Sequence, residues 1–177
     1  MRFLIGLIAG LVLGPIVAWA YLNYGAVPVS VADEPFPMER AIAHNALNAR
    51  IDREAPKKSP IEPSPTNLLI GAQLYRDNCS GCHGYYGQAS PIADHIFPKA
   101  PQLWAPHGKG IVGVSDDPVG ETFWKVQNGI RLSAMPTYKG LLNDTQIWQV
   151  SVLLANADKP LPPDVLQTVK PPAIPTP

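Results

Sequence analysis

The pattern of apolar and polar positions predicts two helices at the start of this chain of 177 residues. Residues 3–24 carry no charged side chain, and a run of that length is long enough to cross a bilayer as a helix. Residues 38–54 contain good helix formers and neither proline nor glycine, although their apolar positions do not share one face. We therefore expect a membrane-spanning helix followed by a short polar helix.

A third helix is expected over residues 66–78, with Thr66 or Asn67 as its N-cap, and it leads directly into Cys79. Residues 84–116 differ from it, because they show little periodicity and contain much glycine and proline. This composition predicts a long ordered loop and not a sheet.

Two more helices have recognisable ends. One is expected to begin at the Asp-Pro pair of residues 117–118 and to stop at the Asn-Gly pair of residues 128–129. The last begins at Asn143, where Gln146 completes a variant of the capping box, and continues through residues 144–156. The patterns together predict an all-α fold.

Proline divides the chain into segments. Of 21 prolines, eight precede residue 66, six lie between residues 66 and 159, and seven crowd the last 18 positions. We expect one compact domain with poorly structured flanks. The expected segments are a transmembrane anchor at 1–25, a juxtamembrane helix and Pro-rich linker serving as a spacer at 26–65, the domain at 66–159 and a disordered tail at 160–177.

Charge excludes some partners. The chain has 14 basic and 14 acidic side chains, so no field of one sign attracts a nucleic acid, and none is expected to bind. The domain at 66–159 is also balanced, with seven of each, so net charge does not fix the polarity of a docking partner.

The apolar start has two interpretations. Arg2 precedes it and Trp19, Tyr21 and Tyr24 crowd its far end, as in a helix anchored at two membrane interfaces. A signal peptide cleaved after Ala20 is the alternative, since an A-x-A site ends there. We favour the retained anchor, because the apolar run continues past the cleavage site. In both interpretations the domain that follows is exported from the cytoplasm.

The stretch "NCSGCHGYYG" contains both cysteines of the chain, Cys79 and Cys82, followed at once by His83. In a helical turn, positions i and i+3 lie on one side, where two sulfurs can reach neighbouring vinyl groups of one porphyrin. C-x-x-C-H is the attachment signature of c-type haem, with the histidine directed at the iron.

Two other chemistries use cysteine pairs. A structural zinc site needs two more ligands, and only His44, His95 and His107 remain, in no recognisable pairing. A thioredoxin-like dithiol needs a preceding strand, whereas a helical pattern precedes this motif. Covalent attachment of one haem c is therefore the preferred interpretation.

Met135 is the candidate sixth ligand of the iron. It lies in the loop segment "NGIRLSAMPTYKG", and Pro136 biases it toward an extended conformation suited to crossing a haem face. Core filling is the ordinary role of a methionine. His95 and His107 are reserve ligands, and either would give a bis-His haem of lower potential.

These motifs resemble those of membrane-anchored, mono-haem class I cytochromes c of bacterial type. The resemblance covers about residues 66–158 and depends on Cys79-Ser80-Gly81-Cys82-His83, on "GIRLSAMP" and on a final amphipathic helix with Trp148. It implies a cytochrome c-like helical domain around a covalent haem, whose first and last helices pack through Gly71, Tyr75 and Trp148. It also implies that the Pro101 carbonyl accepts a hydrogen bond from His83, which would orient the ligand.

Three aromatic side chains are candidate walls of the haem pocket: Trp104, Tyr138 and Trp124. Large aromatic side chains pack well against a flat ring, but they fill the core of any small domain equally well. Both interpretations stay open for each residue.

The expected function is one-electron transfer between respiratory donor and acceptor complexes, at a positive potential and without enzymatic activity. Expected partners are a quinol-oxidising complex, a dehydrogenase or a terminal oxidase or reductase. Expected placement is the bacterial cytoplasmic membrane, with the N-terminus inside and the haem domain in the periplasm. A fixed haem subunit of a larger complex and a peroxidase-type enzyme are the alternatives.

Overall fold

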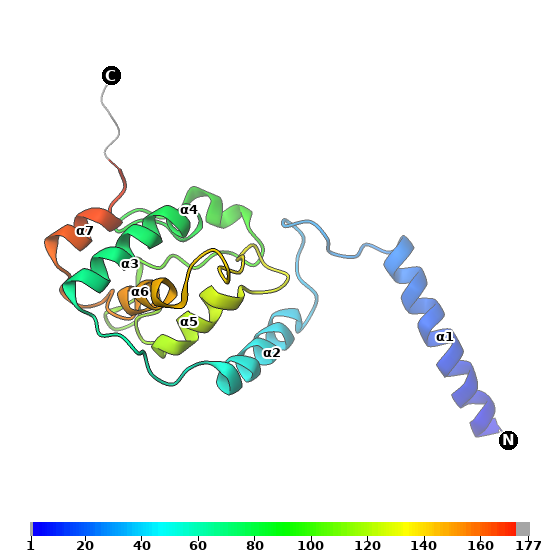
Figure 1. The fold of residues 1–177 in the computed structure, drawn as a ribbon. Coiled ribbons are helices and arrows are strands. Elements are labelled where there is room, and N and C mark those ends of the chain that lie inside the picture. Colours follow the sequence, from blue (N-terminus) through cyan, green and yellow to red (C-terminus); the bar gives the residue numbers. More distant parts are fainter. Residues whose placement is uncertain (1, 173–177) are drawn as a thin grey trace. The chain divides into compact units, whose positions relative to one another are not determined.

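The computed structural model describes residues 2–172, and the fold is built almost entirely of helices (Figure 1). The described residues form seven α-helices, one short 3-10 helix and one hairpin of two-residue strands. The expected all-α class is confirmed. The chain divides into two compact units, one ending at Ala43 and the other beginning at His44.

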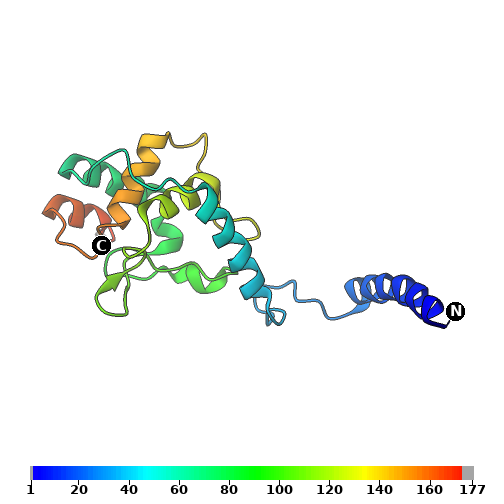
Figure 2. The same ribbon diagram turned by 90° about the horizontal axis from the view of Figure 1, so that it is seen from below.

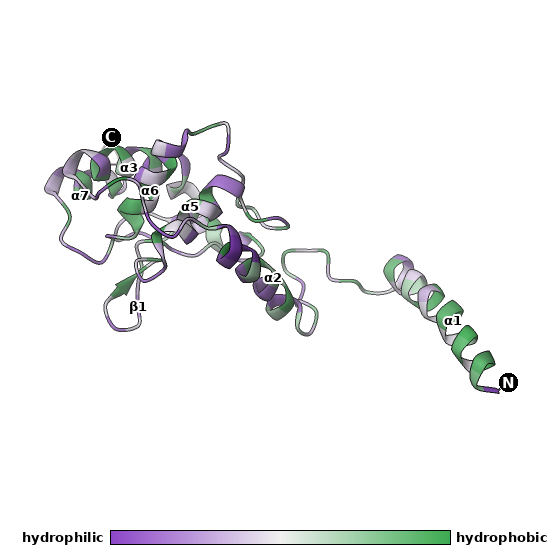
Figure 3. Cartoon of the chain, turned by 60° about the horizontal axis from the view of Figure 1, so that its bottom comes forward, coloured by the Kyte–Doolittle hydropathy of each residue, from purple (hydrophilic) through white to green (hydrophobic). Residues whose placement is uncertain are grey.

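Helix α1 (Arg2–Tyr24) runs without a break through Pro15, and none of its residues is buried. Its 23 residues correspond to about 35 Å at the rise of an α-helix. Figure 3 shows that its surface is mostly apolar, so α1 is long and apolar enough to cross a membrane.

Helix α2 (Glu39–Glu54) confirms the helix expected over residues 38–54. Most of its surface is polar in Figure 3, and Ile51 is its one buried residue. The lack of a continuous apolar face in the sequence therefore corresponds to a helix that buries a single side chain.

The core of the second unit forms where α3 (Pro65–Asn78) packs against α6 (Asp144–Leu154). Gly71 makes this close approach possible, because a Cβ at this position would overlap the backbone carbonyl of Gln149. Trp148 belongs to a second cluster, in which it stacks on Phe123 with ring centroids 4.1 Å apart. The contact implied by the resemblance is therefore made by Gly71 with the backbone of α6, while Trp148 packs on α5.

The N-cap of α3 was expected at Thr66 or Asn67, and this was wrong. Ser64 is the cap, since its side chain accepts a hydrogen bond from the Asn67 backbone N–H at 3.2 Å. Pro65 then occupies the first helical position, where its missing N–H costs nothing.

Helix α5 (Val119–Asn128) ends as expected at Gly129, which adopts a φ of 68°. Its start differs from the prediction. Pro118 occupies the cap position and the Asp117 side chain makes no capping hydrogen bond; its carboxylate lies 3.7 Å from Lys125 Nζ instead. The start of α6 is confirmed, with a complete capping box between Asn143 and Gln146.

The loop after the cysteine motif is long and ordered, as expected. It contains η1 (Pro91–His95) and a hairpin of β1 (Pro106–His107) and β2 (Ile111–Val112). The strands are only two residues each, so the loop contains no extended sheet.

The C-terminal segment was expected to be disordered from residue 160, and here the structure differs. Residues Pro163–Val169 form α7, which packs on α3. Leu161, Val165 and Val169 recur every fourth position and are buried, the last two completely. The prolines start this helix and do not prevent it, because α7 begins directly after Pro162. The end of the expected tail, residues 173–177, lies outside the described residues.

The linker at residues 55–64 was expected to be a spacer, whereas the structure packs it on the domain. Pro56 lies against Gly120, where a Cβ would overlap the Pro56 carbonyl oxygen. Ile61 is half-buried and contacts both hydrophobic clusters. Figure 2 shows α2 and the chain after it running beside α5. This segment therefore belongs to the folded unit.

Replacing Val165 by Ala tests whether α7 belongs to the core. The change removes two buried methyl groups, so we expect the free energy of unfolding to fall by roughly 2 kcal/mol. Guanidinium unfolding of the purified protein measures it. Gln167→Ala, an exposed position on the same helix, is the matched control and should change little. Equal, small effects of both variants would mean that α7 does not contribute to stability.

Candidate functional site

The two cysteines and the histidine lie in one helical turn at the end of α3. Cys79 ends α3 and begins α4 (Ser80–His83), and its carbonyl accepts hydrogen bonds from the backbone N–H groups of Cys82 and His83, at 3.2 and 2.9 Å. Both thiols are free and half-buried. The turn therefore presents both sulfurs on one side, as attachment to adjacent groups of one ligand requires.

His83 is held by a hydrogen bond from its ring. Nδ1 lies 2.7 Å from the carbonyl oxygen of Pro101, and because a carbonyl only accepts, Nδ1 donates the proton. Burial lowers the pKa of His83, so the imidazole is neutral. This tautomer leaves Nε2 as the lone-pair nitrogen, which is the form that binds a metal. The hydrogen bond implied by the resemblance is thus present.

Gln102 connects this turn to the loop, and sequence reasoning missed it. Its Nε2 donates to the Cys82 carbonyl at 3.2 Å, and its Oε1 accepts from the Ser90 backbone N–H at 2.6 Å. The Ser90 hydroxyl in turn donates to the Gly81 carbonyl. These partners are 9 to 20 positions apart in the chain, so no local sequence pattern could have indicated them.

Met135 lies in the loop between α5 and α6 and is half-buried against the cluster around Phe123. Its carbonyl accepts a hydrogen bond from the Ile130 N–H at 3.2 Å, and its own N–H donates to the Ser133 hydroxyl at 3.1 Å. The backbone around the candidate ligand is therefore fixed by short-range hydrogen bonds.

Tyr138 brings the Met135 segment to the cysteine turn. Its hydroxyl donates to the carbonyl of Asn78, the residue before Cys79, at 2.7 Å. Burial raises the pKa of Tyr138 to about 12, and the proximity of the Cys79 and Cys82 thiols adds to this shift. The phenol is thus a neutral donor that joins two segments 60 residues apart.

The two candidate tryptophans have different surroundings. Trp104 is buried with its ring edge-on to Tyr75, at 5.7 Å between centroids, and its Nε1 has no hydrogen-bond partner within residues 2–172. Trp124 donates its Nε1 proton to a carboxylate oxygen of Glu54 at 3.0 Å, so its polar edge points toward α2. The packing of Trp104 on α3 corresponds to the core interpretation.

The reserve histidines lie in the loop after the cysteine turn, and η1, which carries His95, contacts α4. His95 is exposed at the end of η1, and His107 donates from Nε2 to the Gly113 carbonyl at 2.6 Å within its own hairpin. Across residues 2–172, no group of three or more His, Cys, Asp or Glu side chains is arranged to hold a metal ion.

The side chains of the site have the chemistry that a haem c requires. Burial raises the pKa of the Cys79 thiol to about 12, with a smaller contribution from Cys82. Thioether formation with vinyl groups consumes two cysteine side chains, and the turn presents Cys79 and Cys82. Two thiols, a neutral imidazole and a thioether form a donor set that fits haem c.

Replacing Gln102 by Leu tests the connection between the cysteine turn and the loop. The buried N–H of Ser90 loses its acceptor, so we expect the free energy of unfolding to fall by about 1–3 kcal/mol. Guanidinium unfolding measures the loss. Gln88→Ala, an exposed side chain of the same loop, is the control, and a loss no larger than in this control would contradict the assigned role.

A family model matches half of the chain. The family model described as cytochrome C oxidase, cbb3-type, subunit III, matches residues 66–154, which is 89 of the 177 residues. No curated protein matches the sequence. The match begins one residue after the start of α3 and ends with the last residue of α6, so it includes the cysteine turn and the Met135 loop. The chain therefore belongs to the cytochrome c family of cbb3-type oxidase subunit III, in which the domain binds haem.

Proposed function

We propose that this protein is a membrane-tethered electron carrier with one covalently bound haem c, which transfers single electrons between respiratory donor and acceptor complexes. The observation that carries the proposal is the geometry of His83. His83 lies in the turn that presents both cysteine sulfurs, and its Nδ1 donates a hydrogen bond to the carbonyl of Pro101. The haem supplies the reversible one-electron couple of its iron.

Each residue of the site has a role in this proposal. Cys79 and Cys82 would hold the haem through thioether bonds, and Nε2 of His83 and the thioether sulfur of Met135 would bind its iron. The Pro101 carbonyl orients the imidazole and raises its basicity. With two protein ligands on the iron, peroxide would find no open position, so an electron carrier is favoured over a peroxidase. Methionine ligation favours a positive midpoint potential.

The location follows from α1. We infer that α1 is retained as an anchor, with Arg2 on the cytoplasmic side and the haem domain in the periplasm of a bacterial cell. The helix continues without a break through Pro15 and past the A-x-A site to Tyr24, and this supports retention.

A second candidate function is that of a fixed haem subunit in a terminal oxidase complex. The family description names an oxidase subunit, and this observation favours the candidate. The same haem domain then receives electrons at a permanent interface and passes them to the catalytic subunit. Both candidates use the same axial ligands, and they differ in whether partners stay bound.

Replacing Met135 by Ala tests the axial ligand. We expect the haem to stay attached through Cys79 and Cys82, the weak methionine-to-iron absorption band at the red end of the spectrum to disappear, and the midpoint potential to fall. Absorption spectra show whether the band is lost, and redox titration measures the midpoint potential. Met38→Ala, far along the chain and exposed, is the control. Persistence of the band in the Met135 variant would assign the sixth ligand to another residue.

Purification in mild detergent separates the two candidate functions. A shuttle is expected to elute as a single cytochrome of about 19 kDa plus its haem and detergent. A fixed subunit would instead co-purify with other chains in constant ratio. Size-exclusion chromatography with a haem stain distinguishes these results, and a stoichiometric assembly would count against the shuttle.

A further inference from the structure

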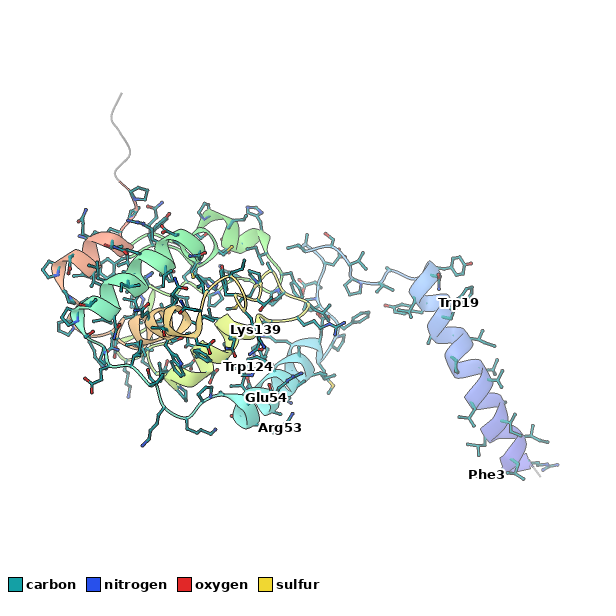
Figure 4. All side chains as sticks on the ribbon, viewed as in Figure 1. Phe3, Trp19, Arg53, Glu54, Trp124 and Lys139 are labelled. Atoms are coloured by element: carbon teal, nitrogen blue, oxygen red, sulfur yellow. The ribbon has the colours of Figure 1, made fainter. Side chains whose placement is uncertain are left out.

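Residues 51–64, which we call the arm, pack on α5 although they lie outside the part of the chain matched by the family. Ile51 is 3% exposed. Trp124 Nε1 donates to Glu54 Oε2 at 3.0 Å, and Figure 4 shows these two side chains next to each other. Pro56 lies against Gly120, which has no side chain to keep the two backbones apart. The arm thus contacts α5 at two points, Gly120 and Trp124.

The second half of α5 holds the Met135 segment. Three hydrogen bonds join the last residues of the helix to this loop: Tyr138 N–H to Val126 O at 3.1 Å, Lys139 N–H to Gln127 O at 3.1 Å and Thr137 Oγ1 to Gln127 O at 2.7 Å. Ile130, just after the helix, donates its N–H to Met135 O at 3.2 Å. A Cβ at Gly129 would overlap the backbone at Pro136. The position of Met135 therefore depends directly on the position of α5.

Helix α5 is a short rod of ten residues, so a shift at one end is transmitted to the other. Trp124 lies one turn before Asn128, whose side chain donates to the Trp124 carbonyl at 2.9 Å. On the other side α5 packs on α6 through the stacked Phe123 and Trp148. The arm and α6 are thus two separate supports of the helix that holds the Met135 loop.

The Glu54 side chain is well suited to act as an acceptor for Trp124. The indole N–H holds the pKa of the Glu54 carboxyl below its usual range, so Glu54 is ionised at neutral pH. Arg50 Nε lies 2.9 Å from the second carboxylate oxygen. A hydrogen bond to an ionised acceptor is stronger than one between neutral groups, and the Trp124 residue that donates it is 8% exposed.

We propose that Glu54 is a positioning residue for the haem iron: by fixing Trp124 it holds α5, and α5 holds Met135 in place as the sixth ligand. The arm is then part of the device that maintains axial ligation, although it lies before the family domain. This inference rests on the proposed function, because it requires Met135 to be the ligand.

The test measures how easily an outside ligand displaces Met135. Imidazole is titrated into the oxidised, full-length holoprotein, and loss of the methionine-to-iron band gives its apparent affinity. In Glu54→Ala the Met135 loop is held less firmly, so we expect imidazole to bind on the order of tenfold more tightly than in the wild type. Glu54→Gln keeps an oxygen acceptor for Trp124, and we expect its affinity for imidazole to stay close to that of the wild type.

Two controls separate positioning from a general loss of stability. Val165→Ala removes buried methyl groups from α7 and destabilises the fold in a helix that packs on α3. Trp124→Phe removes the hydrogen-bond donor and keeps an aromatic ring, so its affinity for imidazole should equal that of Glu54→Ala. The double variant should bind imidazole no more tightly than either single variant. Trp124→Phe also provides the test if Glu54→Ala does not fold.

The outcomes are distinguishable. A wild type without the methionine-to-iron band would overturn the ligand assignment and this inference together. A wild type with the band, and an imidazole affinity in Glu54→Ala that equals that of the wild type or of Val165→Ala, would overturn the positioning role alone.

Discussion

The close crossing of α3 and α6 at Gly71 is the constraint on which the rest of the haem-binding domain depends. Helix α3 delivers the chain into Cys79, so its position fixes where the attachment turn emerges. Helix α6 carries Trp148, on which Phe123 of α5 stacks. Because α5 holds the Met135 loop, the crossing sets the positions of the cysteine turn and of the Met135 loop together. Any side chain at Gly71 would separate the helices and move the two candidate ligands relative to each other.

The features predicted correctly from the sequence are those whose partners are near neighbours in the chain. The capping box of Asn143 and Gln146 spans three residues, and the glycine stop after Asn128 is a single dipeptide. The cysteine turn is equally local, since its geometry follows from the helical period. In each case the residues that decide the structure are the residues of the pattern itself.

The features that the sequence did not reveal depend on partners far along the chain. Tyr138 bonds to a carbonyl 60 positions away, and Gln102 to one 20 positions away. The predictions of a spacer in place of the arm and of a disordered tail in place of α7 were wrong for a related reason. Proline content describes local backbone stiffness, but burial of Ile61 and Val165 depends on surfaces provided by other helices. A proline-rich segment is disordered only when nothing apolar in it finds such a surface.

The packed arm also changes how far the haem domain can move, given the proposed retention of α1. A free linker from Gly25 to Ser64 would have 40 residues and an extended reach of roughly 130–140 Å. Only the 14 residues between α1 and α2 lie outside helices and the arm, and they span at most about 50 Å. Because effective concentration falls roughly as the −3/2 power of linker length, the shorter tether raises it roughly fivefold for any site within reach. Under the proposed function, this short tether favours redox partners that lie within its reach of the membrane, such as membrane-bound donors and acceptors.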